Sequence, residues 1–356
     1  MTLDAMLDGM ARILNEGSST TSYKWLLTWS ILDSAPLQLA RSDGQVLHLR
    51  YVAESANRAM TPQRLPYTPL GRPLKQGSLK DDPLLFREEL SPSTVAWALA
   101  QWPLPRLQHI SSGILEVLWV QQRSWETQLK KDRNSRIPRA LFATDDSGLP
   151  IVPLIDGALE SLLRLSPLVK PLVEIRWRND VRTWNRPAEG ADENWSIDQY
   201  LFPDSTRLTI PKNVHRSLGE IQQGCCFWCE KPLKGKARHA DHVVPWSRSL
   251  NNNIENLVIS DGYCNSIKSD RLISPTLARR WASHVDRNRD TFKGLARSNN
   301  LHFAPNESLA WLISLTRTAT GEVDYFDVSY GEPTVRRARA SAVWPLDISW
   351  LGTVIA

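Results

Sequence analysis

The chain has 356 residues, of which 42% are hydrophobic and 23% charged, as in an ordinary globular protein long enough for two domains. No stretch approaches the roughly 18 apolar residues that a membrane-spanning helix needs. Residues 1–14 carry Asp4 and Asp8 and no continuous apolar segment, so we expect a cytoplasmic protein without a membrane partner.

The net charge of +5 is unevenly distributed along the chain. Residues 205–300 hold 16 Lys and Arg against 8 Asp and Glu, whereas the remainder holds 27 basic and 30 acidic residues. A basic excess confined to one segment is what a polyanion-binding surface requires. A solvated basic face has the same composition, so charge alone leaves both interpretations open.

Helical patterns dominate the N-terminal part of the chain. One face of a helix that starts near Ser22 collects four apolar side chains, Trp25, Leu26, Trp29 and Leu32. Because the residue before a proline avoids the helical conformation, Pro36 predicts that this helix ends at 33–34.

Two further helical blocks are expected, at 93–131 and at 155–184, and the Pro- and Gly-rich residues 62–92 predict an irregular connection. The polar stretch 186–195 predicts a domain boundary. We therefore expect a mainly helical domain over residues 1–195 that serves recognition or partner binding.

The following residues, 196–300, are predicted to form a second domain, with a tail at 301–356 that packs on the rest. Pro211 fits the first turn of a helix that Gly224 stops. Pro275 predicts another helix that ends near Asn288.

All four cysteines lie inside the basic segment, which favours metal ligation over a disulfide framework. Cys226-Phe-Trp-Cys229 alone can be a redox pair or half of a zinc knuckle, but the distant Cys264 favours zinc. A second cysteine pair would place a cysteine at position 261, where this chain has Asp261. Carboxylate oxygen also ligates zinc. The predicted structural zinc site therefore consists of Cys226, Cys229, Asp261 and Cys264. Weak or absent metal binding is the alternative.

Three polar elements accompany the cysteines: Asp241-His242-Val-Val-Pro-Trp-Ser, Asn256-Leu-Val and Cys264-Asn265-Ser-Ile-Lys268-Ser-Asp. Alternation predicts a short strand around 239–243 that places the side chains of Asp241 and His242 on opposite faces. In this order and framed by cysteines, the elements resemble the motif of the HNH endonuclease family, in particular a prokaryotic subgroup. The resemblance covers about 60 to 75 residues.

The resemblance implies a β-hairpin followed by a helix around one divalent ion, a ββα-metal core that we place at 224–275. With the helical N-terminal region, this predicts an α+β chain. His242 matches the general base that deprotonates the attacking water, and Asn256 matches the residue that ties the hairpin loop and orients that histidine.

Other positions match the family's metal and phosphate contacts. Asp241 and Asn265 match ligands of a catalytic Mg²⁺ or Mn²⁺ ion, which prefers hard oxygen donors. Lys268 follows three residues after Asn265, so both share a helix face, and Lys268 is expected to hold a phosphate with help from Arg271.

The resemblance thus implies an endonuclease that hydrolyses DNA, with restriction or phage defence as its expected role. An RNA nuclease is one alternative, and a zinc-ribbon-like nucleic-acid-binding module without catalysis is another. The presence of both Asp241 and His242 speaks against the second. A double-strand cut needs two centres, most simply in a homodimer, for which the helix face around Trp25 and Trp29 is a candidate interface as well as candidate core.

Overall fold

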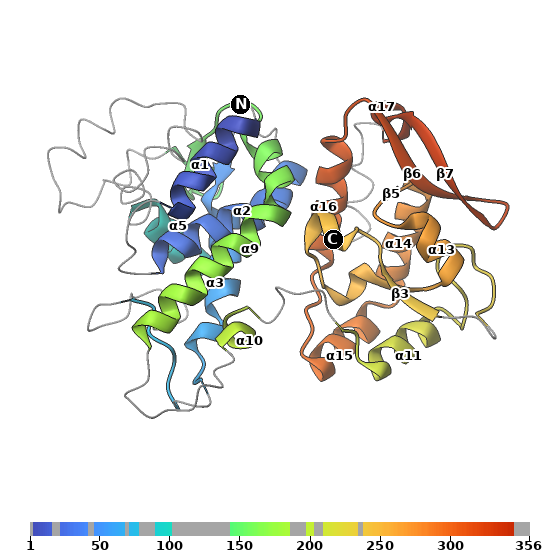
Figure 1. Cartoon of the computed structure of the whole chain (residues 1–356), viewed down its shortest axis with the longest axis horizontal. Coiled ribbons are helices and arrows are strands. Elements are labelled where there is room, and N and C mark those ends of the chain that lie inside the picture. The colour runs from blue at the N-terminus through green and yellow to red at the C-terminus, as the bar shows by residue number, and fades with distance from the viewer. Residues whose placement is uncertain are drawn as a thin grey trace, which may run out of the picture. The chain divides into compact units, whose positions relative to one another are not determined.

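A computed structural model describes residues 3–15, 22–41, 46–67, 71–77, 90–101, 143–185, 197–202, 209–233 and 238–344. The chain divides into two compact units, Met1–Ser205 and Thr206–Ala356 (Figure 1). The first unit is mainly helical, and the second combines helices with two small sheets, so the predicted α+β class is confirmed. None of the helices in these described ranges is long and apolar enough to cross a membrane.

The first unit is built around a pair of long helices, α2 and α9, and α2 also packs against α3. Its described helices are α1 (Leu3–Asn15), α2 (Tyr23–Arg41), α3 (Leu49–Met60), the 3₁₀ turn η1 (Pro62–Arg64), α5 (Pro92–Gln101), α9 (Ala158–Trp184) and α10 (Ile197–Leu201). Two short antiparallel strands, β1 (Val46–His48) and β2 (Ile151–Pro153), pair with Leu47 opposite Val152.

Helix α2 does not end at 33–34, as its proline predicted, but runs through Pro36 to Arg41. Proline has no N–H, so the carbonyl of Leu32 loses its helical partner. The hydroxyl of Ser166 on α9 donates to that carbonyl at 3.2 Å, and this tertiary hydrogen bond replaces the lost one. The predicted end was wrong because a contact from another helix compensates the proline.

The apolar face of α2 is core and not a surface for a second copy. Trp25 and Trp29 are 3% and 7% exposed. Their indole N–H groups donate to α9 carboxylates, Trp25 to Asp180 at 2.6 Å and Trp29 to Glu174 at 2.9 Å. These bonds satisfy the polar end of each buried ring, so the candidate dimer interface on this face is withdrawn.

The structure describes only part of the residues on which the other N-terminal predictions fall. Helix α9 spans 27 residues with Pro167 and Pro171 inside it, which confirms the predicted 155–184 block. Of the 93–131 block, only α5 is described, and the stretch 186–195 lies outside the described residues. The described residues of 62–92 hold η1 and an isolated bridge between Tyr67 and Arg72, in keeping with an irregular connection.

The described part of the second unit combines short helices with short strands. Its described elements are α11 (Lys212–Ile221), β3 (Arg238–His242), α12 (Trp246–Ser249), the 3₁₀ turn η3 (Ile254–Asn256), β4 (Leu257–Asp261), α13 (Gly262–Lys268), β5 (Leu272–Ile273), α14 (Pro275–Arg287), α15 (Arg289–Asn299), α16 (Pro305–Arg317), β6 (Glu322–Ser329), β7 (Glu332–Arg339) and α17 (Ala340–Val343).

Strands β3 and β4 form an antiparallel pair in which Asp241 lies opposite Val258 and His242 opposite Leu257. Helix α13 follows β4 directly, because the side chain of Asp261 accepts the N–H of Cys264 at 2.8 Å and so caps the first turn. The two strands and α13 therefore form the predicted ββα arrangement.

The residues after α13 continue the same unit. Strand β5 pairs in parallel with β6, and β6 pairs antiparallel with β7 (Figure 1). Helix α14 confirms the helix expected after Pro275, with Ser274 as its cap, whereas α15 and α16 were not predicted. Ring contacts join Trp228, before β3, to Phe326 on β6, so the C-terminal strands contribute to the core behind the ββα arrangement.

Candidate active site and metal centre

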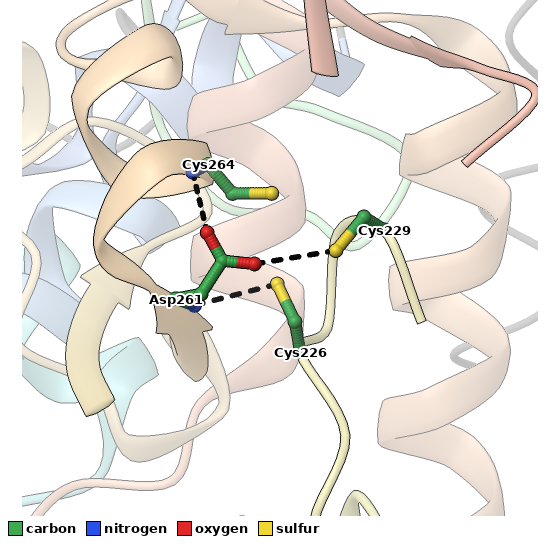
Figure 2. A group of neighbouring side chains, drawn as sticks. All are labelled: Cys226, Cys229, Asp261 and Cys264. Atoms are coloured by element: carbon green, nitrogen blue, oxygen red, sulfur yellow. Dashed lines mark hydrogen bonds between the residues drawn. The ribbon is translucent and has the colours of Figure 1, made fainter. Parts of the chain in front are cut away.

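Four buried side chains, which we call the cysteine cluster, point toward one another in Figure 2: Cys226, Cys229, Asp261 and Cys264. One ligand atom from each lies within 4.8 Å of the others. Two residues come from the loop before β3, one from the end of β4 and one from the first turn of α13. The structure thus brings together the four residues expected at the structural zinc site.

Backbone hydrogen bonds hold the first two cysteines in a tight turn. The N–H of Cys226 donates to the carbonyl of Lys231, and the N–H of Glu230 donates to the carbonyl of Cys226, both at 2.9 Å. Glu230 adopts the left-handed conformation that closes this turn, with φ 61°. The N–H of Phe227 donates to Ile259 on β4 at 2.9 Å, which ties the turn to the ββα arrangement.

The cluster concentrates acidic groups in a buried place. The thiol of Cys229 donates to Asp261 at 3.3 Å. Burial works to raise the pKa of Asp261, but the N–H of Cys264 and the thiols around it lower it below its ordinary value. A hydrogen bond from Cys264 lowers the pKa of Cys226 to about 6 and raises that of Cys264. A carboxylate beside a thiolate is a negative site that a divalent cation neutralises.

The donor set and its spacing fit zinc. Tetrahedral zinc with bonds of about 2.3 Å to sulfur holds its ligand atoms about 3.8 Å apart, so the cluster needs only a small contraction to close on the ion. Three thiolates and one carboxylate are zinc ligands by type, and all four are buried, as in a structural site without an open position.

Asp241 on β3 is held by two buried donors. The indole N–H of Trp228 donates to one of its carboxylate oxygens at 2.9 Å, and the ammonium of Lys268 lies 3.4 Å from the other. The same ammonium donates to the carbonyl of His242 at 2.5 Å. Burial lowers the pKa of Lys268, and the carboxylate of Asp241 opposes that shift.

His242 ends β3 with its side chain 3% exposed, and Asn256 closes the loop that follows. The Asn256 amide accepts the N–H of Val244 at 2.8 Å and donates to the carbonyls of Val244 and Asn251, each at 3.1 Å. The backbone carbonyl of Asn256 accepts the N–H of Val243 at 2.8 Å. These bonds fix the backbone on both sides of the hairpin loop next to His242.

Helix α13 carries the remaining candidate residues. Asn265 is half-buried and Lys268 is fully buried, so the two do not share an open face. A buried ammonium that is paired with Asp241 cannot reach a phosphate at the surface, and the expected phosphate contact of Lys268 is withdrawn for that reason. Arg271 is half-buried and donates to the carbonyl of Ile267 at 2.9 Å, which uses one of its five N–H groups.

The hydrogen bond from Trp228 to Asp241 was not predicted from the sequence. The cysteines on either side of this residue were predicted site residues, but its ring was assigned no partner. A signal was available: Trp228 stands between two cysteines of the cluster, and the N–H of a buried indole usually finds an acceptor. The acceptor is Asp241, 13 residues further along the chain.

Comparison with known proteins gives a match that covers this site. A family model described as HNH endonuclease matches residues 226–271, from the first cysteine of the cluster to Arg271. No curated protein and no solved structure matches the chain.

Proposed function

We propose that this protein is a metal-dependent endonuclease that hydrolyses DNA phosphodiester bonds, because residues 226–271 match a family model described as HNH endonuclease. The observation that carries the proposal is the ββα arrangement itself. It places Asp241 and His242 at the end of β3, closes their loop through Asn256, and supplies Asn265 from the helix that follows β4.

In this proposal His242 acts as the general base. Imidazole is a common general base in proteins, and His242 would take the proton of the water that attacks the phosphorus. Asn256 is a positioning residue for it, since the bonds of its amide hold the backbone of Val244, two residues beyond the histidine. The carbonyl of His242 is held from the other side by Lys268.

Asp241 and Asn265 would hold the catalytic ion. Their hard oxygen donors fit Mg²⁺ or Mn²⁺, and two protein ligands leave positions for water and phosphate oxygens, as is usual for Mg²⁺. When bound, the ion supplies positive charge that stabilises the charge developing on the phosphate and the leaving oxygen. Lys268 orients Asp241 instead of contacting substrate, and Arg271, with N–H groups to spare, takes the phosphate contact.

The cysteine cluster would hold a structural zinc ion. Its donor set supports this, and so does its place, because it joins the loop before β3 to the end of β4 and the start of α13. We propose that zinc contributes to folding of this segment and takes no part in hydrolysis.

The choice of DNA over RNA rests on the family and on one observation. Single-stranded RNA is commonly read by exposed aromatic rings, and Trp228 is fully buried. Tyr263 on α13, 61% exposed, is the ring that would serve an RNA substrate, so RNA is kept as the second candidate.

Supercoiled plasmid, linear duplex and structured RNA should each be incubated with the full chain and Mg²⁺, Mn²⁺ or EDTA. We expect cleavage of the plasmid with either ion and none in EDTA. One centre cuts one strand, so nicked circles should precede linear DNA, and the linear fraction should rise with protein concentration if a homodimer supplies the second centre. Cleavage of RNA alone, or equal cleavage in EDTA, would contradict the proposal.

Asn265→Ala removes one ligand of the proposed ion and leaves the base in place. We expect the Mn²⁺ concentration for half-maximal cleavage to rise about tenfold or more, with partial recovery at high Mn²⁺. Ser266→Ala, the next residue on α13 and exposed, is the matched control and should keep the wild-type dependence. A metal titration that is the same for both variants would remove Asn265 from the ligand set.

The remaining proposals concern the whole chain. We propose that the first unit recognises the target or a protein partner, and that the enzyme acts in the cytoplasm in restriction or defence against phages. Plating of phages on cells that express the wild type or a variant without cleavage activity tests this role, and equal plating on both contradicts it.

A further inference from the structure

We propose that Trp228 is a positioning residue of the catalytic centre. In this proposal its indole N–H holds the carboxylate of Asp241 in the orientation that receives the catalytic ion. The cysteine cluster, which fixes Trp228, would thereby set the geometry of the catalytic centre as well as the stability of the fold. The inference rests on the proposed function of Asp241 as a metal ligand.

The first observation is that the carboxylate of Asp241 is held at both oxygens. Trp228 donates to one at 2.9 Å and Lys268 lies 3.4 Å from the other. All three side chains are buried, with 0% exposure for the two donors and 5% for Asp241. Where water has little access, a lost donor is not readily replaced, so these two bonds determine how the carboxylate is rotated.

The second observation is that Trp228 itself has little freedom. It lies between the two cysteines of the turn, and its carbonyl accepts Arg280 of α14 at 2.5 Å. Its ring meets the edges of Phe227 and Phe326, with centroids 5.0 and 5.4 Å away. The direction of the N–H is therefore set by the cluster on one side and by the core of the second unit on the other.

The third observation concerns the room left for an ion. A carboxylate has about four lone-pair sites on its two oxygens. The donors from Trp228 and Lys268 occupy one site on each oxygen, which leaves the other lone pairs for a metal. Hydrogen bonds of this kind to a ligand oxygen typically change metal affinity or activity by about 10- to 100-fold when they are removed.

A purely structural role for Trp228 makes a different prediction. A core tryptophan with a satisfied N–H would affect stability when it is changed, but not the dependence of the centre on the divalent ion. The two roles are therefore separated by a metal titration of a variant that keeps the ring and loses the donor.

Trp228→Phe is that variant, and Trp344→Phe is the matched control. The Trp344 indole is also buried and donates to a carbonyl, that of Ile273, at 3.2 Å, but it contacts neither Asp241 nor the cluster. Binding of Mn²⁺ to the full zinc-loaded chain is followed by electron paramagnetic resonance, and plasmid nicking is measured against Mn²⁺ concentration. Zinc content is measured by elemental analysis.

We expect Trp228→Phe to weaken Mn²⁺ binding and to shift the nicking curve by about 10- to 100-fold toward higher Mn²⁺, with one zinc retained and most of the rate recovered at saturation. Trp344→Phe should match the wild type. If Trp228→Phe does not fold, 3-benzothienylalanine at position 228, which keeps the shape of indole and replaces N–H by sulfur, provides the same comparison.

Suppose that the wild-type chain cuts DNA and binds Mn²⁺, and that the variant without the N–H has an unchanged Mn²⁺ dependence. This result overturns the inference about Trp228 and leaves the proposed function standing. An equal shift in both tryptophan variants also overturns it. A wild-type chain that neither binds Mn²⁺ nor cuts DNA overturns the proposed function and this inference with it.

Discussion

His242→Ala is expected to reduce the rate of DNA cleavage by about 10²- to 10⁴-fold, the usual cost of losing a general base. The substitution removes the imidazole but none of the proposed ligands of the divalent ion, so Mn²⁺ binding and DNA binding should stay close to wild type. Single-turnover nicking of plasmid at saturating Mn²⁺ measures the rate of the chemical step without the contribution of product release.

His239→Ala is the matched control, since this histidine lies three residues before His242 on the same strand and is exposed. Its ring packs near Gly262, where an added Cβ would lie 3.2 Å from its Nε2. This variant should cut at nearly the wild-type rate. Cleavage by His242→Ala at a comparable rate would show that another group takes the proton and would refute the assignment of the base.

Cys226→Ser is expected to abolish stoichiometric zinc binding and to lower the thermal stability of the second unit by several degrees or more. Structural zinc contributes about 10–16 kcal/mol to the folding of isolated zinc-finger peptides. The second unit also has an apolar core around Trp228, Trp281 and Phe326, so it should lose only part of that amount. Elemental analysis gives the zinc content, and calorimetry gives the unfolding temperature.

The neighbouring residue provides the control. Cys225 is half-buried and its thiol lies near the carbonyl of Gln223, at 3.8 Å, outside the cluster. Cys225→Ser should therefore retain zinc and the wild-type melting temperature. A wild-type chain purified without zinc, or equal behaviour of the two serine variants, would leave the buried cysteines as core residues only.

Part of the site was predictable from the sequence. Alternation around Asp241, a local signal, predicted a strand, and the resemblance to the HNH family implied a hairpin followed by a helix. The structure confirms the strand and the ββα arrangement, whereas the cap that Asp261 supplies to α13 was not predicted. The helix that begins at Pro275 was also predicted from a local signal.

Other features that the sequence did not predict are contacts between residues far apart in the chain. Helix α2 passes Pro36 because Ser166, 134 residues from Leu32, supplies the missing donor. Propensity and periodicity describe local backbone preferences and the spacing of apolar residues along the chain. They carry no information on which distant side chain will reach a given carbonyl.

In the second unit, contacts between residues far apart in the chain also decide the arrangement of the site. A lysine three residues after Asn265 looked available for a phosphate, but packing of α13 on β3 buries Lys268 against Asp241. Trp228 reaches the same carboxylate from the turn between the cysteines. The sequence determined the residue types of the proposed catalytic centre and of the cysteine cluster. Only the tertiary structure decided which buried donors hold Asp241, because that depends on how three separate segments pack around one carboxylate.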